Sequence, residues 1–287
     1  MKKCVLLMMG VLLLTSCSQQ QVMNEVAEDI AKENSEVTIS VANPVNEYLE
    51  KARWGDGNAF LKLAECYHKG IGVKPDFMGT ITMLTMAGQY GQPNSIEEYI
   101  MSLPETDEAR LIFEAMEDFD HHRHERADSV IEMMIANGSA DGYALRGILQ
   151  IEQGDTIEGK QTIQTGAQMG SSYAEMLLCA IPEQGKQKSK QIAMDMLAAL
   201  SDRVPLANQI LGNYYSGIEY DRPIDVYLAA KYYKKADEHG CLGKRPAQWL
   251  LDYYRNEGIA IDSVETRRLQ TLCGYNLDSI ESVIDNN

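Results

Sequence analysis

The sequence predicts an all-α fold, an α-solenoid of stacked helix–turn–helix repeats. Three observations lead to this prediction. Helix-end signals recur along the chain at spacings of 47, 32, 32, 38 and 34 residues. Apolar residues ahead of several of these ends follow the i, i+3/i+4 spacing of amphipathic helices. No long alternating strand pattern occurs after residue 43. A single helix pair cannot bury its apolar face, whereas stacked pairs share one continuous core.

The first element is an export signal. Lys2 and Lys3 precede an apolar run of ten residues, Val5 to Leu14, which is too short for a bilayer span of about 20 residues. Residues 1–16 are therefore predicted to be a signal peptide that is removed from the mature protein. The alternative within this reading is an ordinary secretory signal in which Cys17 has no special role.

The end of this signal resembles the lipobox of bacterial lipoproteins. The matching residues are Leu14-Thr15-Ser16-Cys17. The resemblance implies cleavage after Ser16, a diacylglyceryl thioether on Cys17 and acylation of the new N-terminus. Three acyl chains would exceed the two signals that stable anchoring needs. Ser18 is not the Asp that usually retains such proteins in the inner membrane, so we expect an outer-membrane anchor with the body in the periplasm.

The charge of the mature chain excludes several partners. Cleavage after residue 16 would leave 24 basic and 42 acidic residues, a balance of −18. A body of this charge is repelled by nucleic acid and by anionic headgroups. We therefore expect no nucleic-acid binding, membrane contact only through the lipid on Cys17, and a partner surface that is basic or neutral.

The remainder divides into a tether and a folded body. Residues 17–43 lack a core pattern and are predicted to be a flexible lipidated tether, and residues 44–287 are predicted to form the solenoid. The body contains Cys66, Cys179, Cys241 and Cys273. Disulfides are permitted in the expected compartment, and four cysteines allow three pairings. Four buried free thiols are the other possibility.

Three copies of one pattern define the repeat. An aspartate stands eleven positions before a small residue, and a glycine follows four positions later. The copies are Asp76, Ala87 and Gly91, then Asp155, Gly166 and Gly170, then Asp225, Ala236 and Gly240. Aspartate caps helix N-termini and glycine supplies a left-handed C-terminal cap. Weaker echoes place further helix ends near residues 138, 202 and 274, and the clearest repeats span about 57–91, 139–170 and 204–240.

The first repeat, residues 57–91, resembles a Sel-one-like repeat (SLR), a relative of the tetratricopeptide repeat. It has Ala59, Leu63 and Ala64 on the first helix, Tyr67 near its end, the loop Gly70-Ile71-Gly72-Val73, and then Asp76. The fifth repeat, about residues 204–240, keeps much of this pattern with two inserted residues. The third repeat, about residues 139–170, lacks the glycine loop. The resemblance covers about residues 57–274. It implies a right-handed superhelix whose concave face binds proteins.

No residue cluster predicts catalysis, a cofactor or a metal. His121, His122 and His124 are interpreted as a polar turn, with a metal site as the alternative. Glu114, Glu117, Asp118 and Asp120 are interpreted as the solvated face of a helix rather than as acid–base groups. The cysteine-rich SLR proteins linked to penicillin binding or hydrolysis carry a cysteine pair in each repeat, which this chain lacks.

Aromatic residues concentrate in the last two repeats and are the candidate partner-binding residues. Tyrosine and tryptophan are favoured at binding hot spots, although family tyrosines also fill the core between helices. One member of each adjacent tyrosine pair is expected at the surface. The candidates are Tyr214, Tyr215, Tyr232, Tyr233, Trp249, Tyr253 and Tyr254.

The sequence thus predicts a lipid-anchored, non-enzymatic envelope protein that binds a protein or peptide through the concave face of its solenoid. One alternative is a cell-wall or glycan-acting enzyme that uses a pair of Asp or Glu residues, one with a raised pKa. Another is a structural spacer in an envelope assembly.

Overall fold

The computed structural model describes residues 43–181, 190–218 and 225–274, and within these ranges it contains fourteen α-helices and no strand. Residues 1–42, which include the predicted signal peptide, Cys17 and nearly all of the predicted tether, lie outside the described residues, as do residues 182–189, 219–224 and 275–287. No described helix combines the length and apolar composition of a membrane span. The helices are α2 (Pro44–Ala52), α3 (Gly57–Lys69), α4 (Phe77–Gln89), α5 (Ser95–Ser102), α6 (Glu108–Asp120), α7 (His124–Ala136), α8 (Ala140–Glu152), α9 (Thr156–Gln168), α10 (Ser172–Ala180), α11 (Lys190–Leu200), α12 (Pro205–Ser216), α13 (Val226–Glu238), α14 (Lys244–Asn256) and α15 (Ser263–Cys273).

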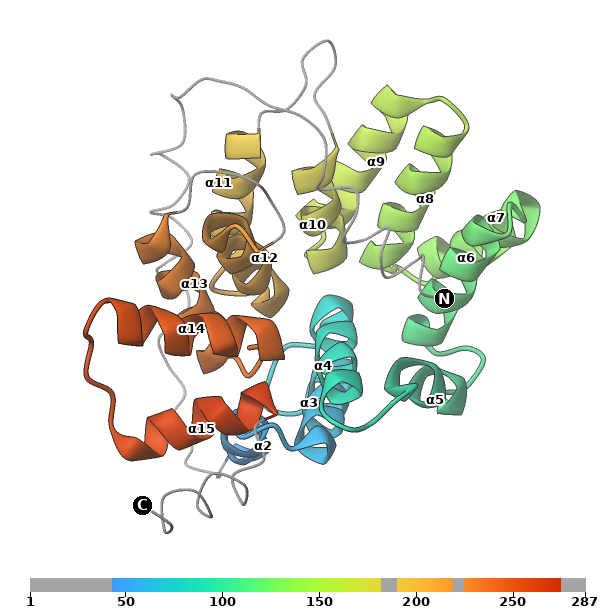
Figure 1. The fold of residues 1–287 in the computed structure, drawn as a ribbon. Helices are drawn as coiled ribbons and strands as arrows, with labels where there is room; N and C mark the ends of the chain where they lie inside the picture. The colour runs from blue at the N-terminus through green and yellow to red at the C-terminus, as the bar shows by residue number, and fades with distance from the viewer. Residues whose placement is uncertain (1–42, 182–189, 219–224, 275–287) are drawn as a thin grey trace.

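The predicted fold class is confirmed. The helices form hairpins, α3 with α4, α6 with α7 and onward to α14 with α15, and neighbouring hairpins stack on one another (Figure 1). All six predicted helix ends lie within two residues of the ends of α4, α7, α9, α11, α13 and α15. Five of these ends are followed by a glycine with positive φ, between 67° and 99°. Because this left-handed conformation costs glycine little, the glycines stop the helices where the sequence indicated.

The predicted aspartate caps are confirmed in two repeats and partly in the third. The Asp76 carboxylate accepts a hydrogen bond from Gly79 N at the start of α4, and Asp225 accepts one from Leu228 N at the start of α13. Asp155 stands at the N-cap of α9, but its side chain makes no capping hydrogen bond. At that position the carboxylate stays close to the positive end of the helix dipole.

The small residues of the repeat allow close helix packing, as predicted. A Cβ atom at Gly166 of α9 would lie 2.7 Å from the carbonyl oxygen of Ala140. A Cβ atom at Gly147 of α8 would lie 2.4 Å from the carbonyl oxygen of Gly159. Carbon atoms do not approach carbonyl oxygens this closely, so α8 and α9 meet backbone to backbone.

The second repeat is longer because it contains an extra helix that the sequence reasoning did not foresee. Helix α5 lies between α4 and α6 and has only eight residues. Its N-cap, Asn94, has a φ of 64°, and the side chain makes no capping hydrogen bond. The weak start signal and the short length explain why the helix was missed.

The array of hairpins curves until its two ends meet (Figure 1). Arg53, at the end of α2, donates through Nη2 to Asp237 of α13 at 2.9 Å. Arg268 of α15 donates to both oxygens of Asp237, at 2.8 and 2.7 Å, and to the carbonyl oxygen of Arg53 at 2.8 Å. The hydroxyl of Tyr90, just after α4, donates to the carbonyl oxygen of Leu242 at 3.0 Å. The solenoid is therefore closed by contacts between its first and last repeats.

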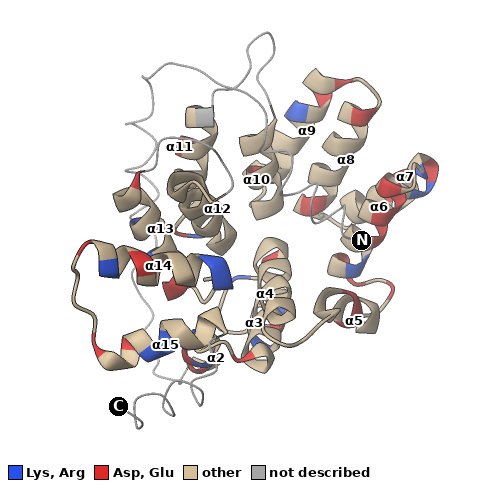
Figure 2. Cartoon of the chain, in the orientation of Figure 1, with Lys and Arg blue, Asp and Glu red and all other residues tan. Residues whose placement is uncertain are grey.

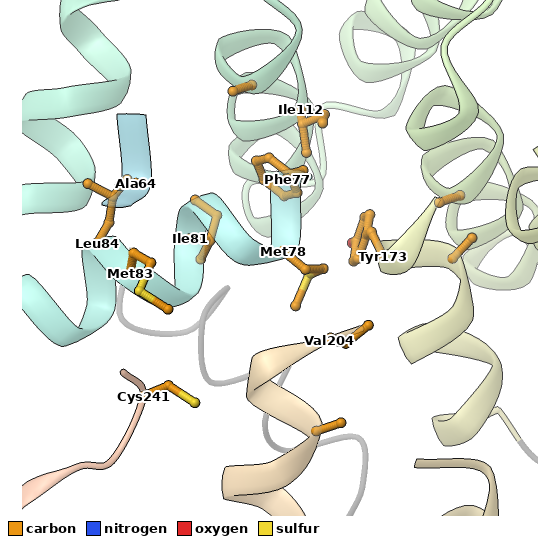
Figure 3. Close-up of a cluster of buried hydrophobic side chains, with 14 of the residues drawn as sticks. Ala64, Phe77, Met78, Ile81, Met83, Leu84, Ile112, Tyr173, Val204 and Cys241 are labelled. Atoms are coloured by element: carbon orange, nitrogen blue, oxygen red, sulfur yellow. The ribbon is translucent and has the colours of Figure 1, made fainter. Parts of the chain in front are cut away.

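Helix α4 fills the inner side of this curve. Its residues from Phe77 through Leu84 are all buried, and α4 contacts α3, α5, α10 and α12. Tyr173 of α10, Val204 before α12 and Cys241 after α13 lie around it (Figure 3). A helix that is apolar on all sides is stable only when it is surrounded. The hypothesis of an open concave groove therefore needs revision, because α4 occupies the inner side in the described part of the chain.

Candidate partner-binding surface

Helices α12, α13 and α14 carry all seven candidate aromatic residues. Helix α12 begins at Pro205, a position where the missing N–H costs nothing, and it ends before Gly217, which has a φ of 72°. A Cβ atom at Gly212 would lie 2.3 Å from the ring of Tyr233. The lack of a side chain at Gly212 therefore lets α13 place a tyrosine ring directly against the backbone of α12.

Tyr233 is the buried anchor of this region. Its side chain is fully buried, and its hydroxyl donates to Asn213 Oδ1 at 2.9 Å. The Ser216 hydroxyl lies 2.8 Å from the hydroxyl oxygen of Tyr233. These partners satisfy a phenol that would otherwise lose its water on burial. Tyr233 therefore positions α12 against α13 and is not available to a partner.

The rings form two groups. In the first, Tyr215 lies 5.1 Å from Tyr214 and stacks on Tyr232 at 5.8 Å, with 9° between the ring planes. In the second, Trp249 contacts Tyr233 edge to face at 5.3 Å and stacks on Tyr253 at 5.4 Å. These distances lie in the range of favourable aromatic pairs, so the rings hold one another in place.

The adjacent tyrosine pairs do not behave as expected. Tyr232 and Tyr233 are 7% and 0% exposed, and Tyr253 and Tyr254 are 9% and 8% exposed. The expectation that one member of each pair lies at the surface is therefore wrong for α13 and α14. The reason is that α13 packs against both α12 and α14, so residues 100° apart on its circumference meet different neighbours.

The accessible part of the aromatic surface is smaller than the candidate set. Tyr214, Tyr215 and Trp249 are partly exposed. Tyr227, which was not among the candidates, is 72% exposed. Burial raises the pKa of the Tyr253 phenol, and Glu257 and Tyr227 add to this effect. Helical periodicity could have identified Tyr227, because it lies on the same side of α13 as Lys231 and Lys234, which are polar and expected to be exposed.

Lysines lie over buried rings of this surface. The Lys231 ammonium is 5.4 Å from the centre of the Tyr232 ring, and the Lys234 ammonium is 5.2 Å from the centre of the Tyr254 ring. Both distances fit cation–π contacts. Burial raises the pKa of the Tyr254 phenol to about 12, so this ring stays neutral beneath the lysine.

The histidine cluster forms the turn between α6 and α7, as the first interpretation held. His121 and His122 are exposed, His122 has a φ of 56°, and His121 Nδ1 lies 2.7 Å from the Glu117 carbonyl oxygen. His124 lies 3.7 Å from a carboxylate oxygen of Glu152. Within the described ranges no three histidine, cysteine or acidic side chains converge as metal ligands would.

One member of the acidic stretch is not on a solvated face. Asp118 is 1% exposed and accepts a hydrogen bond from Arg123 Nε at 2.7 Å. Arg126 Nε lies 3.3 Å from its other oxygen. The interpretation as a wet helix face is therefore wrong for Asp118, because the chain turns back after α6 and brings two arginines to it.

A different pair of carboxylates bears on the enzymatic alternative. Asp76 of the α4 N-cap accepts a hydrogen bond from Ser172, and Asp141 of α8 accepts one from Ser171. Burial raises the pKa of both carboxyls, that of Asp141 to about 6. Each carboxylate is thus engaged at a helix junction, Asp76 also by the N–H of Gly79.

The cysteines resolve the open question about disulfides. Within the described residues, Cys66, Cys179, Cys241 and Cys273 form no disulfide, and the first three are buried. Burial raises the pKa of Cys241 and raises that of Cys273 to about 11. The thiols of Cys241 and Cys273 therefore stay protonated at neutral pH.

Comparison with known proteins gives structural resemblance only. No family model and no curated protein matches the chain. A Sel1 repeat protein from Oxalobacter formigenes aligns with a TM-score of 0.36 and 17% identity, covering 80% of this chain and 97% of that one. A protective antigen with an SLR fold from uropathogenic Escherichia coli strains aligns with a TM-score of 0.32 and 19% identity over 80% of this chain. This chain spans 55% of the length of that antigen.

Proposed function

We propose that this protein is a lipid-anchored scaffold of the bacterial envelope that binds another protein through the outer surface of α12–α14. The anchor is the lipid that the lipobox-like segment would receive on Cys17. The body would stand on the periplasmic side of the outer membrane, beyond a tether of residues 17–43. The protein would act by binding and would not be an enzyme.

The observation that carries the binding proposal is the aromatic surface itself. Tyr227 is 72% exposed and Trp249 is partly exposed, and the rings that Trp249 contacts are fixed by stacking and by the hydrogen bond of Tyr233. A preformed aromatic surface loses little conformational entropy on binding, and Tyr and Trp dominate binding hot spots. We place the binding surface on exposed side chains of α12–α14 rather than in a concave groove, because α4 fills the inner side of the curve in the described part of the chain.

The carboxylates Asp76 and Asp141 support the scaffold over the enzyme. A general acid needs its raised pKa and also access to substrate. Asp76 caps α4, and both carboxylates accept serine hydroxyls that join α4, α8 and α10. We therefore assign these groups to the joining of repeats rather than to acid–base chemistry.

Site-specific photo-crosslinking in living cells tests the binding proposal. A photoreactive phenylalanine derivative placed at Tyr227 should crosslink to one discrete envelope protein. The same residue at Ile157, which is 53% exposed on α9, is the matched control and should give no such product. Trp249→Ala should remove the Tyr227 crosslink. Identical products from both positions, or none from Tyr227, would contradict the proposal.

The anchor is tested by mass measurement of the mature protein. We expect an N-terminus at Cys17 that carries a diacylglyceryl group and an amide-linked acyl chain. Cys17→Ser should give an unlipidated protein that leaves the membrane fraction, with the body folded as before. A mature wild-type protein with an unmodified Cys17, or one that begins at another residue, would refute the lipid anchor. The binding surface would still be tested independently by the crosslinking experiment.

A further inference from the structure

The solvent-exposed stripe of α13 differs in charge from the molecule as a whole. Its exposed positions include Tyr227, Lys231 and Lys234, spaced so that they lie along one side of the helix. Neither lysine forms an ion pair with a carboxylate of the described residues. The stripe therefore presents a phenol ring and two ammonium groups to solvent, followed one turn later by the exposed carboxylate of Glu238 at the end of α13.

Helix α14 extends this stripe. Trp249 is partly exposed and stacks on Tyr253, and α14 packs against α13, which carries Tyr227. Lys244 and Arg245 at the start of α14 are exposed, and the Lys244 ammonium lies 5.5 Å from the centre of the Tyr90 ring. We call the surface made by Tyr227, Lys231, Lys234 and Trp249 the α13–α14 face.

The charge balance changes sharply across the molecule. Residues 225–274 contain eight basic and seven acidic side chains, in a chain whose net charge is −16. Residues 95–168, which form α5 to α9, contain five basic and sixteen acidic side chains. Figure 2 shows acidic residues along α6 to α9 and basic residues at both ends of α14. The strongly negative net charge of the whole chain therefore does not describe the region that carries the α13–α14 face, where basic and acidic residues nearly balance.

We infer that the α13–α14 face binds an acidic segment of a partner protein that also carries aromatic or aliphatic side chains. This inference rests on the proposed function and revises the expected partner from basic or neutral to acidic. Carboxylates of the segment would pair with Lys231 and Lys234, which the rings of Tyr232 and Tyr254 already hold in place. An apolar side chain between two carboxylates would cover Tyr227 and Trp249.

The spacing of the side chains along α13 favours a peptide segment as the binding partner. Charges at Lys231 and Lys234 lie one helical turn apart, and Tyr227 lies one turn before Lys231. A segment with acidic residues one turn apart and an apolar residue beside them matches this order. Complementary charge confers specificity and the ring contacts supply most of the affinity.

Binding of designed peptides to the full mature protein in detergent tests the inference. The probe is a fluorescein-labelled twelve-residue peptide with alternating Glu and Leu or Trp, and two further peptides replace each Glu by Gln or by Lys. Fluorescence anisotropy should show the Glu peptide binding at least about tenfold more tightly than the Lys peptide, with the Gln peptide between them. Equal binding of all three peptides would overturn the inference.

Matched charge reversals locate the site. Lys231→Glu and Trp249→Ala should each weaken binding of the Glu peptide by about fivefold to tenfold. Lys160→Glu, on α9, makes the same charge change on the acidic side and should have a much smaller effect. Equal losses from Lys231→Glu and Lys160→Glu would mean that only net charge matters, and the inference would fail.

Two other occupants give distinct results. Concentration-dependent dimers in sedimentation velocity, abolished by Lys231→Glu, would identify a second copy of this chain as the occupant. Binding of unlipidated Cys17→Ser protein to phosphatidylglycerol vesicles, abolished by the same change, would identify a membrane. Either result would overturn the inference. A Tyr227 crosslink that persists in Lys231→Glu would overturn the acidic partner but leave the proposed function standing, whereas no crosslink would remove both.

Discussion

The acidic arm of α5–α9 and the aromatic region of α12–α15 are built on the same hairpin plan but expose different chemistry. In the arm, α8 and α9 meet through glycine backbone, and sixteen acidic side chains lie among residues 95–168. In α12–α15, tyrosine and tryptophan rings fill the spaces between helices, and the charges nearly balance. The comparison teaches that the repeat fixes helix ends and contacts, while the residues between them decide what a region binds.

The largest expected effect is at the junction between the two ends of the chain. Asp237→Ala would leave Arg53 and Arg268 without their shared carboxylate, and Arg268 is 4% exposed. Removing one partner of a buried ion pair costs about 3–5 kcal/mol of unfolding free energy. Chemical denaturation should show this loss.

The exposed ion pair Glu47–Lys51 is the control for this junction, and Lys51→Ala should leave the denaturation midpoint nearly unchanged. If Asp237→Ala also left the denaturation midpoint unchanged, this ion-pair network would not hold the two ends of the helical array together, and the two ends would fold independently.

The next effect sharpens the contrast in packing. Gly147→Ala places a Cβ atom 2.4 Å from the Gly159 carbonyl oxygen, so α8 and α9 must separate, at a cost of about 1–3 kcal/mol. Gly88→Ala is the matched control, because its Cβ atom would meet nothing closer than 3.5 Å. That change should raise stability by about 0.5–1 kcal/mol. Thermal unfolding of the two variants should move in opposite directions, and parallel shifts would refute the backbone contact.

A smaller effect separates buried from accessible tyrosines. Tyr233→Phe removes the hydroxyl bonded to Asn213 and near Ser216, which should lower stability by about 1–2 kcal/mol. Tyr227→Phe, at an exposed ring, should leave stability unchanged. Urea denaturation of both variants checks this, and equal losses would show that the two tyrosines are not distinguished by burial.

The smallest effect is a pH dependence in the region that joins α4, α8 and α10. The raised pKa of Asp141, about 6, means that the folded state binds a proton more tightly than the unfolded state. This contribution to stability is full below the ordinary pKa of 3.8 and is lost as pH rises through about 6. The groups that face Asp141 are Ser171, Glu108 and Asp76. Asp141→Asn should flatten the change in unfolding free energy between pH 4 and pH 6, and an unchanged slope would assign it to another group.

The sequence predicted the local features well because their causes are local. Asp76 and Asp225 cap helices through N–H groups three residues away, and glycines such as Gly91 end helices by their own φ. The candidate surface was predicted less well. Trp249 and Tyr215 are accessible to some degree, but Tyr232, Tyr253 and Tyr254 are buried, and Tyr227 was not selected. Helical periodicity gives the direction of a side chain and does not show how many neighbours surround the helix.

By itself the sequence determined an all-α repeat protein, the ends of its hairpins and the close approach of helices at small residues. Only the tertiary structure decided that the array closes on itself, that α4 fills the inner side and which of the aromatic rings are accessible. The physical reason is distance along the chain. Arg53 and Asp237 are separated by 184 residues, and their contact depends on the summed curvature of every hairpin between them. No local pattern encodes that sum.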